Sequence, residues 1–337
     1  MQNVGGICLV KMSDIAKEAG VSVSTVSRVM NNSAAISAQT RARILEAAAQ
    51  LGYHRRPEPL IPSKANNVAG VIVPDMMSDY YARFLDAVVE EFAKKGLSAL
   101  ISISHFRTEE AILAVKQMYG CKVKCLLIII DDCEVVSEQL LTVVRDAHLP
   151  VMFITAAYIS DMDFDCLYVD EMRSSVMAVE HLLHRGYKDL AFVGELYTAN
   201  RRDIFLKTMR RFKMPVRPEL IRIGAERAEL GGYLRTKELL ALQKLPDAIY
   251  ASYDQMAIGV IHAIREAGLR IPQDIAVIGS TGMPLSGYIE GGLTTVTSPL
   301  NEMVSIAVRI LVRRIEMPFS QPQQIAIKPI LSVRATT

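Results

Sequence analysis

The sequence predicts a small all-α head, a linker, and an α/β core built of two doubly wound lobes. Apolar residues recur with helical spacing over residues 12–53, and residues 54–67 contain three prolines and no periodicity. From residue 68, apolar runs of strand length alternate with amphipathic stretches. With 337 residues, 50% of them hydrophobic and 22% charged, the chain is long enough for two or three ordered domains.

Three short helices are expected in the head. A serine cap begins the first helix, over 12–19, and Gly20 ends it. Ser22 can cap a second helix over 23–30, and Ser37 a third over 38–51. The residues expected to face the core of the head are Ile15, Ala16, Ala19, Val26, Val29, Met30, Ile44, Leu45, Ala48 and Leu51. Two short helices joined by a tight glycine-containing turn and followed by a third predict a helix-turn-helix domain.

Seven strands are expected in the core. They are 69–73, 97–101, 126–130, 151–154, 190–193, 248–251 and 275–278. Several are continuous apolar runs, which is typical of parallel strands whose two faces are both covered by helices. Seven strand–helix units exceed one comfortable sheet, so we expect two lobes with a cleft between them.

The charges divide unevenly along the chain. Residues 1–64 contain eight basic and four acidic side chains, whereas the remainder contains 30 basic and 32 acidic ones. A basic N-terminal piece on a slightly acidic body indicates a small anion-binding module attached to a larger domain.

Motifs for catalysis or metal binding are missing from the sequence. There is no glycine-rich dinucleotide or phosphate loop and no Gly-x-Ser-x-Gly turn. His181 and His184 lie three apart without a third ligand, and Cys121 and Cys125 lie four apart without a second pair. We therefore expect no enzyme, cofactor or metal, and five buried, reduced cysteines.

The chain ends and apolar runs indicate a cytoplasmic protein that does not enter membranes. The longest apolar runs, such as 125–130, fall far short of the ~20 residues that a membrane span needs. The N-terminus has no signal-peptide pattern. Residues 1–11 are either a flexible extension or a mis-assigned start, with initiation near Val10 or Met12.

The head and several strings of the core resemble the lactose/galactose-repressor (LacI/GalR) family of bacterial transcriptional regulators. The head string is DIAKEAGVSVSTVSRVMN, from Asp14 to Asn31, and the match continues from Ile36 to Tyr53. The core strings are HLLxxGY at 181–187, LAFVG at 190–194, PDAI at 246–249, DQMA at 254–257 and LTTV at 293–296. Nearly the whole chain is therefore covered by the resemblance.

The resemblance implies three parts. A helix-turn-helix DNA-binding head covers 12–56, a proline-rich hinge linker 57–67, and an effector-binding and dimerisation core 68–337. This core is expected to be periplasmic-binding-protein-like. Its N-lobe would cover about 68–165 and 296–323, and its C-lobe about 166–295 and 324–337.

The second helix of the head is expected to enter the major groove of DNA. Val23, Ser24, Ser27 and Arg28 line its outward face, which has little apolar bulk and fits a groove about 12 Å wide. By resemblance, Val23 and Ser24 read bases, and Arg28 reads a guanine or clamps a phosphate. The residues suited to backbone contacts are Ser13, Ser22, Thr25, Asn31 and Ser37.

The hinge is where the sequence departs from the family. By resemblance, a short hinge helix should insert a leucine into the minor groove, but Pro62 stands at that position, and Pro57 and Pro59 precede it. Proline inside a helix costs ~3 kcal/mol or more. We expect the hinge to stay extended and the kinking of DNA to be weakened, with Leu60 or Ile61 as the remaining apolar wedge.

The cleft residues are assigned by resemblance. Tyr80 and Tyr81 stand where family members stack aromatics on the ligand, and Arg201 is the ligand-gripping arginine, with Arg202 as its rival. Tyr253 replaces an asparagine and Thr281 replaces an aspartate of the sugar-binding members. Asp170 lies near the crossover between lobes. The replacements at Tyr253 and Thr281 favour a smaller, flatter or more aromatic ligand.

Together these features predict a transcriptional regulator, by resemblance a repressor, that binds a near-palindromic double-stranded DNA operator as a homodimer. A small-molecule effector, a sugar or other metabolite, would bind in the cleft. A competing hypothesis is a cytoplasmic small-molecule sensor whose DNA binding is weakened by the atypical hinge. An enzyme on the same scaffold has no motif to support it.

Overall fold

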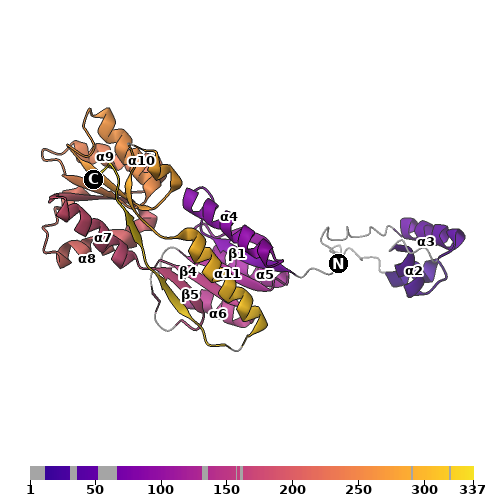
Figure 1. Cartoon of the computed structure of the whole chain (residues 1–337). Helices are drawn as coiled ribbons and strands as arrows, with labels where there is room; N and C mark the ends of the chain where they lie inside the picture. The colour runs from indigo at the N-terminus through magenta and orange to yellow at the C-terminus, as the bar shows by residue number, and fades with distance from the viewer. Residues whose placement is uncertain are drawn as a thin grey trace, which may run out of the picture. The chain divides into compact units, whose positions relative to one another are not determined.

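The structure, a computed structural model, describes residues 12–30, 36–51, 67–130, 136–156, 158–159, 162–289, 291–318 and 320–337. The chain divides into two compact units, Met1–Ala65 and Asn66–Thr337. The first contains the three helices of the head, and the second contains both lobes of the core (Figure 1).

The head consists of α1 (Met12–Glu18), α2 (Val23–Met30) and α3 (Ala38–Gln50). The Ser37 hydroxyl caps α3 by accepting a 3.3 Å hydrogen bond from the amide of Thr40. The buried core is formed by Ile15, Ala16, Ala19, Val26, Val29, Ile44, Ala47 and Ala48. The three predicted helices are thus confirmed.

One predicted core residue of the head is wrong. Leu45 is 49% exposed, and Ala47 is buried in its place. The buried stripe of α3 runs through Ile44, Ala47 and Ala48, with spacings of three and four residues. Leu45 directly follows Ile44, so the helical turn of about 100° per residue carries it off the stripe.

The first lobe contains a six-stranded parallel sheet in the order β11-β5-β4-β3-β1-β2. Its strands are β1 (Val68–Val73), β2 (Ser98–Ile103), β3 (Cys125–Ile130), β4 (Val151–Thr155), β5 (Asp165–Val169) and β11 (Gln324–Ile327). Its helices are α4 (Asp79–Lys94), α5 (Thr108–Gly120), α6 (Glu138–Ala147) and α11 (Leu300–Glu316). Helices α4 and α11 cover one face of the sheet, and α5 and α6 cover the other.

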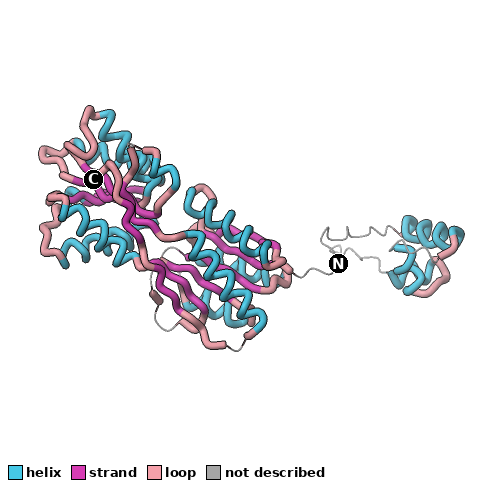
Figure 2. The backbone as a smooth tube through the Cα atoms, viewed as in Figure 1, coloured by secondary structure: helices cyan, strands magenta, loops and turns pink. Residues whose placement is uncertain are grey.

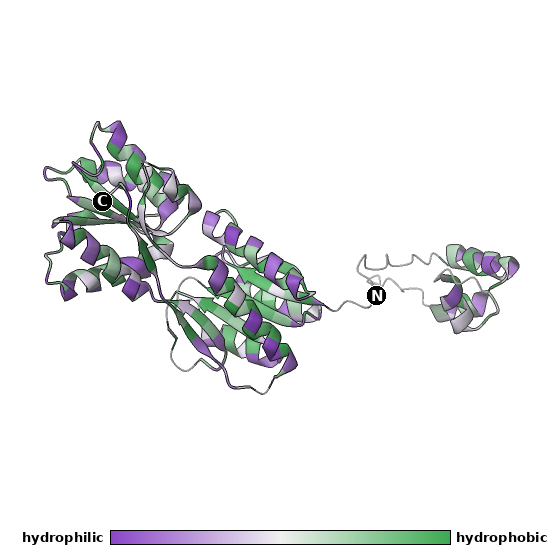
Figure 3. Cartoon of the chain, in the orientation of Figure 1, coloured by the Kyte–Doolittle hydropathy of each residue, from purple (hydrophilic) through white to green (hydrophobic). Residues whose placement is uncertain are grey.

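The second lobe repeats this arrangement in the order β12-β10-β9-β8-β6-β7, with β12 antiparallel to β10. Its strands are β6 (Leu190–Glu195), β7 (Ile221–Gly224), β8 (Ala248–Ala251), β9 (Ala276–Thr281), β10 (Thr294–Thr297) and β12 (Ile330–Ser332). Its helices are α7 (Glu171–His184), α8 (Ala199–Arg211), α9 (Ala228–Leu240) and α10 (Asp254–Glu266), with short 3-10 turns at Leu196–Thr198, Pro218–Leu220 and Pro284–Gly287. In both lobes apolar strands lie between helices whose outer faces are polar (Figures 2 and 3).

The chain crosses between the lobes three times, from β5 to α7, from β10 to α11 and from β11 to β12. The predicted boundaries at 165/166, 295/296 and 323/324 were each wrong by a few residues. The boundary at 295/296 cuts through β10, which belongs wholly to the second sheet. Strands β5 and β11 both belong to the first sheet, where Cys166 lies opposite Gln324. They stay there because each is held by a parallel neighbour, β4 for β5 and β5 for β11, before the chain leaves the lobe.

All seven predicted strands are present, and five further strands were missed. The missed strands are β5, β7, β10, β11 and β12. Each has only three to five residues, and β7, β11 and β12 are partly exposed rather than continuously buried. A short, half-buried strand lacks the continuous apolar run by which the others were predicted.

The prediction for the cysteines was only partly right. Cys125 and Cys166 are buried and free, but Cys121 is exposed, because it follows α5 in a surface turn. Burial raises the pKa of the Cys125 thiol to about 12. Cys8 and Cys133 lie outside the described residues.

Helices α9 and α10 approach each other closely because glycines lie where they cross. A Cβ atom at Gly259 of α10 would overlap the carbonyl oxygen of Glu229 in α9. Only glycine permits backbones this close. Arg227 directly precedes α9 and Tyr253 directly precedes α10, so this packing fixes the spacing between these two side chains.

In the described part of the chain, no helix is both long and apolar enough to cross a bilayer.

Candidate DNA-binding face and effector cleft

The start of α2 presents a small polar surface. The Ser22 hydroxyl accepts a 3.2 Å hydrogen bond from the amide of Thr25 and lies 2.8 Å from the hydroxyl of Ser24. Val23 is 49% exposed, and Ser24 and Arg28 are also exposed, whereas Ser27 is half-buried. The inward side chains Val26 and Val29 hold this face outward by packing into the head core.

Of the remaining residues predicted to contact DNA, only some lie in the part of the chain that the structure describes. Ser13 is exposed at the start of α1, where its hydroxyl lies 3.5 Å from Asp14. Asn31 and Leu60 lie outside the described residues. The same holds for the hinge prolines, so the expectation of an extended hinge stays a prediction.

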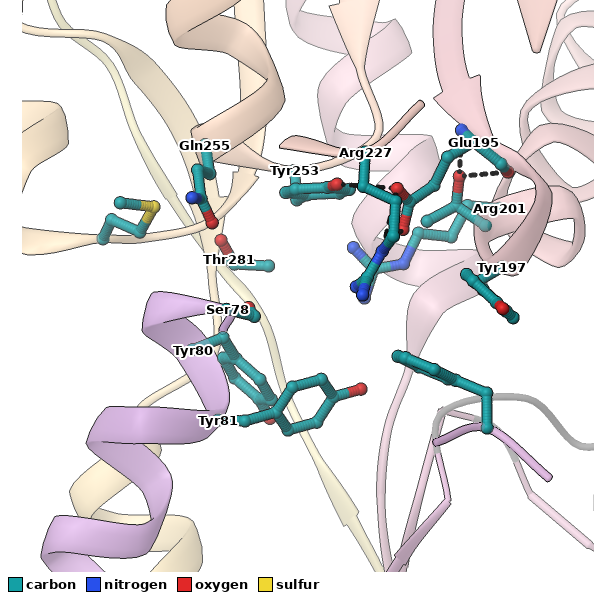
Figure 4. Close-up of a pocket in the computed structure, with 13 residues that line it drawn as sticks. Ser78, Tyr80, Tyr81, Glu195, Tyr197, Arg201, Arg227, Tyr253, Gln255 and Thr281 are labelled. Atoms are coloured by element: carbon teal, nitrogen blue, oxygen red, sulfur yellow. Dashed lines mark hydrogen bonds and ion pairs between the residues drawn. The ribbon is translucent and has the colours of Figure 1, made fainter. Parts of the chain in front are cut away.

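Two adjoining cavities lie where the lobes meet. The first encloses about 480 Å³, including space open to solvent, and is lined by Ser78, Tyr80, Tyr81, Phe106, Glu195, Tyr197, Thr198, Arg201, Arg227, Tyr253, Gln255, Thr281 and Met283 (Figure 4). The second encloses about 490 Å³ and shares Tyr80, Arg201 and Thr281 with the first. Five of the six predicted effector residues, namely Tyr80, Tyr81, Arg201, Tyr253 and Thr281, therefore come together at one place.

The sixth predicted effector residue, Asp170, lines neither cavity. It lies between β5 and α7, where its carboxylate accepts a 2.9 Å hydrogen bond from the amide of Arg173. This contact caps the N-terminus of α7, which favours a negative charge there. Asp170 thus serves a local structural role at the first crossover between the lobes.

Two positions of the cleft are fixed by charged hydrogen bonds. Arg201 donates from Nη1 to the carbonyl oxygen of Ser252 at 2.7 Å and pairs through Nη2 with Glu171 at 3.2 Å. The hydroxyl of Tyr253 donates to Glu195 at 3.0 Å and accepts from the amide of Ala228 at 2.8 Å. Burial, followed by the negative charge of Glu195, raises the pKa of Tyr253, so its phenol stays protonated.

A buried carboxylate supports the floor of the cleft. Asp254 accepts hydrogen bonds from the hydroxyls of Ser286 and Thr295, both at 2.6 Å, and from the amide of Met283 at 2.8 Å. Burial raises the pKa of Asp254 to about 6 despite these bonds. Thr281, the last residue of β9, and Met283 both line the cavity. The hydrogen bonds of Asp254 therefore position this wall of the cavity.

Sequence reasoning missed eight residues that line the first cavity, namely Ser78, Phe106, Glu195, Tyr197, Thr198, Arg227, Gln255 and Met283. It also missed Asp75, which contacts Arg227. Asp75 closely follows β1 and Glu195 ends β6, and an acid at the carboxyl end of a buried parallel strand is a usable signal, since ligands bind there in open α/β sheets. Arg227 lies in a loop with no periodicity, so no comparable signal marked it.

One of the two histidines on α7 lies against the C-terminal residue of the chain. His181 is half-buried, and its Nε2 lies 2.8 Å from the hydroxyl of Thr337. Burial, followed by the charge of Arg185, lowers the pKa of His181. Among the described residues, no three His, Cys, Asp or Glu side chains gather in a way that could hold a metal.

The fold and the site define a class of protein: a helix-turn-helix head attached to a two-lobed α/β core with a ligand-sized cavity between the lobes. Residues 11–56 match the model for bacterial regulatory proteins of the lacI family, and residues 179–337 match the periplasmic binding protein-like domain. The HTH-type transcriptional repressor PurR of Yersinia pestis is 30% identical over 336 residues, covering 96% of this chain and 95% of that protein. Catabolite control protein A of Priestia megaterium is 27% identical over 312 residues, covering 90% and 92%.

Solved structures of the same fold cover almost the whole chain. The complex of the transcriptional regulator CelR with cellobiose superposes with a TM-score of 0.70 at 21% identity, covering 97% of this chain and 100% of that one. The lac repressor dimer bound to operator and the anti-inducer ONPF superposes with a TM-score of 0.72 at 24% identity, covering 97% and 99%. The chain belongs to the lacI family of bacterial regulatory proteins. It is a DNA-binding regulator of transcription with a periplasmic-binding-protein-like core.

Proposed function

We propose that this regulator is a repressor that binds a near-palindromic operator as a homodimer, and that a small molecule in the inter-lobe cleft controls this binding. The observation that carries the proposal is the exposed face of α2, which projects from a well-packed helix-turn-helix core. The name of PurR, a transcriptional repressor that matches over nearly the full chain, supports repression rather than activation.

Specific side chains of α2 would read the operator. Val23 suits contact with a thymine methyl group, and Arg28 suits a guanine edge or a phosphate. Ser24 can accept or donate a hydrogen bond and therefore discriminates weakly. Ser27 would belong to the groove-facing surface with these three residues. Ser13, Ser22, Thr25 and Ser37 would position the head through phosphate contacts, and Asn31 and Leu60 keep their proposed roles in backbone contact and as a minor-groove wedge.

The cleft would take a small molecule with a flat face. Tyr80, Tyr81 and Tyr253 give the cavity aromatic walls, which suit planar or ring-shaped ligands. Arg201 and Thr281 supply polar contacts on the side of the second lobe. The complex of CelR with cellobiose supports effector binding by a protein of this fold.

An exposed apolar surface on the second lobe supports a dimer. Leu230 of α9 is 58% exposed, and it adjoins Tyr233 and Ile258 around a shallow apolar depression. Covering such a surface with its two-fold mate would bury apolar area on both copies. Two heads related by this symmetry would read two half-sites of a near-palindrome.

The test is a footprint of the whole protein on DNA upstream of its own gene and the neighbouring operon, at low and high salt. We expect protection of a two-fold site that weakens steeply as salt rises. Arg28→Ala should lose sequence preference, while Arg43→Ala, which removes an equal charge from exposed α3, should weaken binding without changing preference. If the fluorescence of the protein changes on adding a metabolite but no DNA site is protected, the small-molecule sensor is favoured instead.

A further inference from the structure

One arginine of the second lobe bonds to carboxylates of both lobes. Arg227 donates from Nη1 to Asp75 Oδ2 at 2.7 Å, and Asp75 belongs to the first lobe, just after β1. The same guanidinium donates from Nε to both oxygens of Glu195, at 3.1 and 3.2 Å, at the end of β6 in the second lobe. Arg227 thus ties the two lobes together through its side chain.

Aromatic rings from the two lobes meet beside this guanidinium. Phe106 of the first lobe stacks on Tyr197 of the second, with 4.3 Å between ring centroids and 20° between ring planes. The Arg227 Cζ atom lies 4.9 Å from the centroid of Phe106 and 5.4 Å from that of Tyr197. At these distances the negative faces of aromatic rings attract a cation.

The backbone around the cleft is held in a conformation that non-glycine residues rarely adopt. His105, Phe106, Ala228 and Thr281 all have positive φ angles, of 52°, 56°, 52° and 96°. Each lies at the cleft or next to a residue that lines it. Strained backbone persists where surrounding contacts over-determine it, so the contacts made by Phe106 and by the loop of Arg227 have a positioning role.

The charges at this point of contact favour a cation between the two lobes. The side chains of Asp75 and Glu195 are 9% and 3% exposed, so bringing these two carboxylates together without a cation would cost both burial and repulsion. Burial alone would lower the pKa of Arg227, but Glu195 and Asp75 outweigh it and raise that pKa. Arg227 therefore stays charged at neutral pH.

We propose that Arg227 is the residue that closes the cleft, and that the pocket formed by Asp75, Glu195, Phe106 and Tyr197 is a guanidinium site. Closure of the lobes requires a planar cation in this site. In the wild-type chain Arg227 supplies it from within. In a chain that lacks the Arg227 side chain, a free guanidinium-type cation takes its place.

The consequence for transcription rests on the proposed function, because it assumes that the arrangement of the lobes controls the heads. The closing role of Arg227 does not depend on that assumption. The experiment therefore reads the distance between the lobes directly and measures operator binding in parallel on the same samples.

The lobe distance can be measured between spin labels at exposed Cys121 in the first lobe and at Lys207→Cys in the second. Cys8 and Cys133 are replaced by serine in all variants, and labelled protein is diluted with unlabelled protein so that only distances within one chain are read. In Arg227→Ala we expect the ratio of closed to open molecules to fall about 10- to 100-fold, since hydrogen bonds between charged groups are the strong ones.

Methylguanidinium at millimolar concentration, far below levels that unfold proteins, should restore the short distance in Arg227→Ala. Equal concentrations of sodium chloride or methylammonium should not, because neither offers a planar set of donors. Arg235→Ala is the matched control, since Arg235 lies on α9 and pairs with Glu226 and Glu238 within its own lobe. Asp75→Asn provides a second test that leaves the Arg227–Glu195 pair intact.

The proposal is overturned if Arg227→Ala and Asp75→Asn keep the wild-type distance, or if sodium chloride restores closure as well as methylguanidinium does. If the lobe distance responds as expected but operator affinity does not, the guanidinium site stands and control of DNA binding by the cleft fails. If operator binding responds to metabolites but the lobe distance never depends on Arg227, control of DNA binding by the cleft stands and the guanidinium site fails.

Discussion

Replacing Gly259 by alanine should destabilise the core, although the same change stabilises most helices. In an ordinary helix interior, alanine is favoured over glycine by about 1 kcal/mol. At Gly259 the new Cβ would overlap the carbonyl oxygen of Glu229 and lie 2.6 Å from the amide nitrogen of Tyr233. Both are backbone atoms, so neither can rotate away.

The magnitude follows from the distance by which the helices must separate. Ordinary non-bonded contacts lie near 3.5 Å, so α9 and α10 must move apart by about 1–2 Å. Overpacking of this kind costs about 1–3 kcal/mol, and we take the upper end because the obstacle is rigid. After the helix-propensity gain, Gly259→Ala should lower the free energy of unfolding by about 2 kcal/mol.

Urea unfolding followed by far-UV circular dichroism measures this difference as a shift of the midpoint at constant slope. Gly287→Ala is the control, because a Cβ there meets nothing within 4 Å, and it should gain about 0.4–1 kcal/mol. A Gly259→Ala protein as stable as wild type would refute the reasoning. The variant should also weaken effector binding, since the separation moves Arg227 away from Tyr253.

Three further predictions address thiols, pH and an ion pair. In the native protein a thiol reagent should modify Cys121 and spare the buried thiols of β3 and β5, as peptide mass spectrometry would show; modification of the buried thiols at the same rate would contradict the burial. The pKa of Asp254 is about 6 in the folded protein against 3.8 when unfolded, so its protonated form adds stability that is complete below pH ~4 and is lost as the pH rises through 6. Between pH 4 and 7, wild type should therefore lose about 3 kcal/mol of unfolding free energy relative to Asp254→Asn, and equal pH profiles of the two proteins in urea titrations would exclude this. Arg314→Ala should lower the free energy of unfolding by about 3–5 kcal/mol, because it leaves Asp165, which is 1% exposed, without its bidentate partner. Arg309→Ala, on the exposed side of α11, should cost little, and similar urea midpoints for the two variants would refute the argument.

The elements that could be predicted from the sequence are those that bury one continuous or periodic apolar surface. The three helices of the head and the central strands of both lobes have such surfaces. Strands such as β7 and β12 lie at sheet edges and are half exposed, so their composition resembles that of a loop. Their pairing depends on a partner distant in sequence, which local reasoning does not contain.

The cleft could be predicted only in part, for a related reason. Tyr80, Arg201 and Tyr253 occupy positions that the family resemblance marks, and they do converge on the cavity. Asp75 and Arg227 are 152 residues apart in the chain and meet only because the lobes close on each other. A charged residue in a loop gives no sign of the partner it will find across a domain interface.

The three crossings between the lobes have a consequence for the order in which a growing chain can fold. Synthesis delivers the head first, and among the described residues its core is complete at Leu51. The first lobe follows in sequence, but one face of its sheet is covered by α11 and one edge is formed by β11, at 300–327. Five of the six strands of the second lobe are made by residue 297. On the ribosome, the second lobe should therefore assemble before the first, and a head able to meet DNA should exist before any cleft able to govern it.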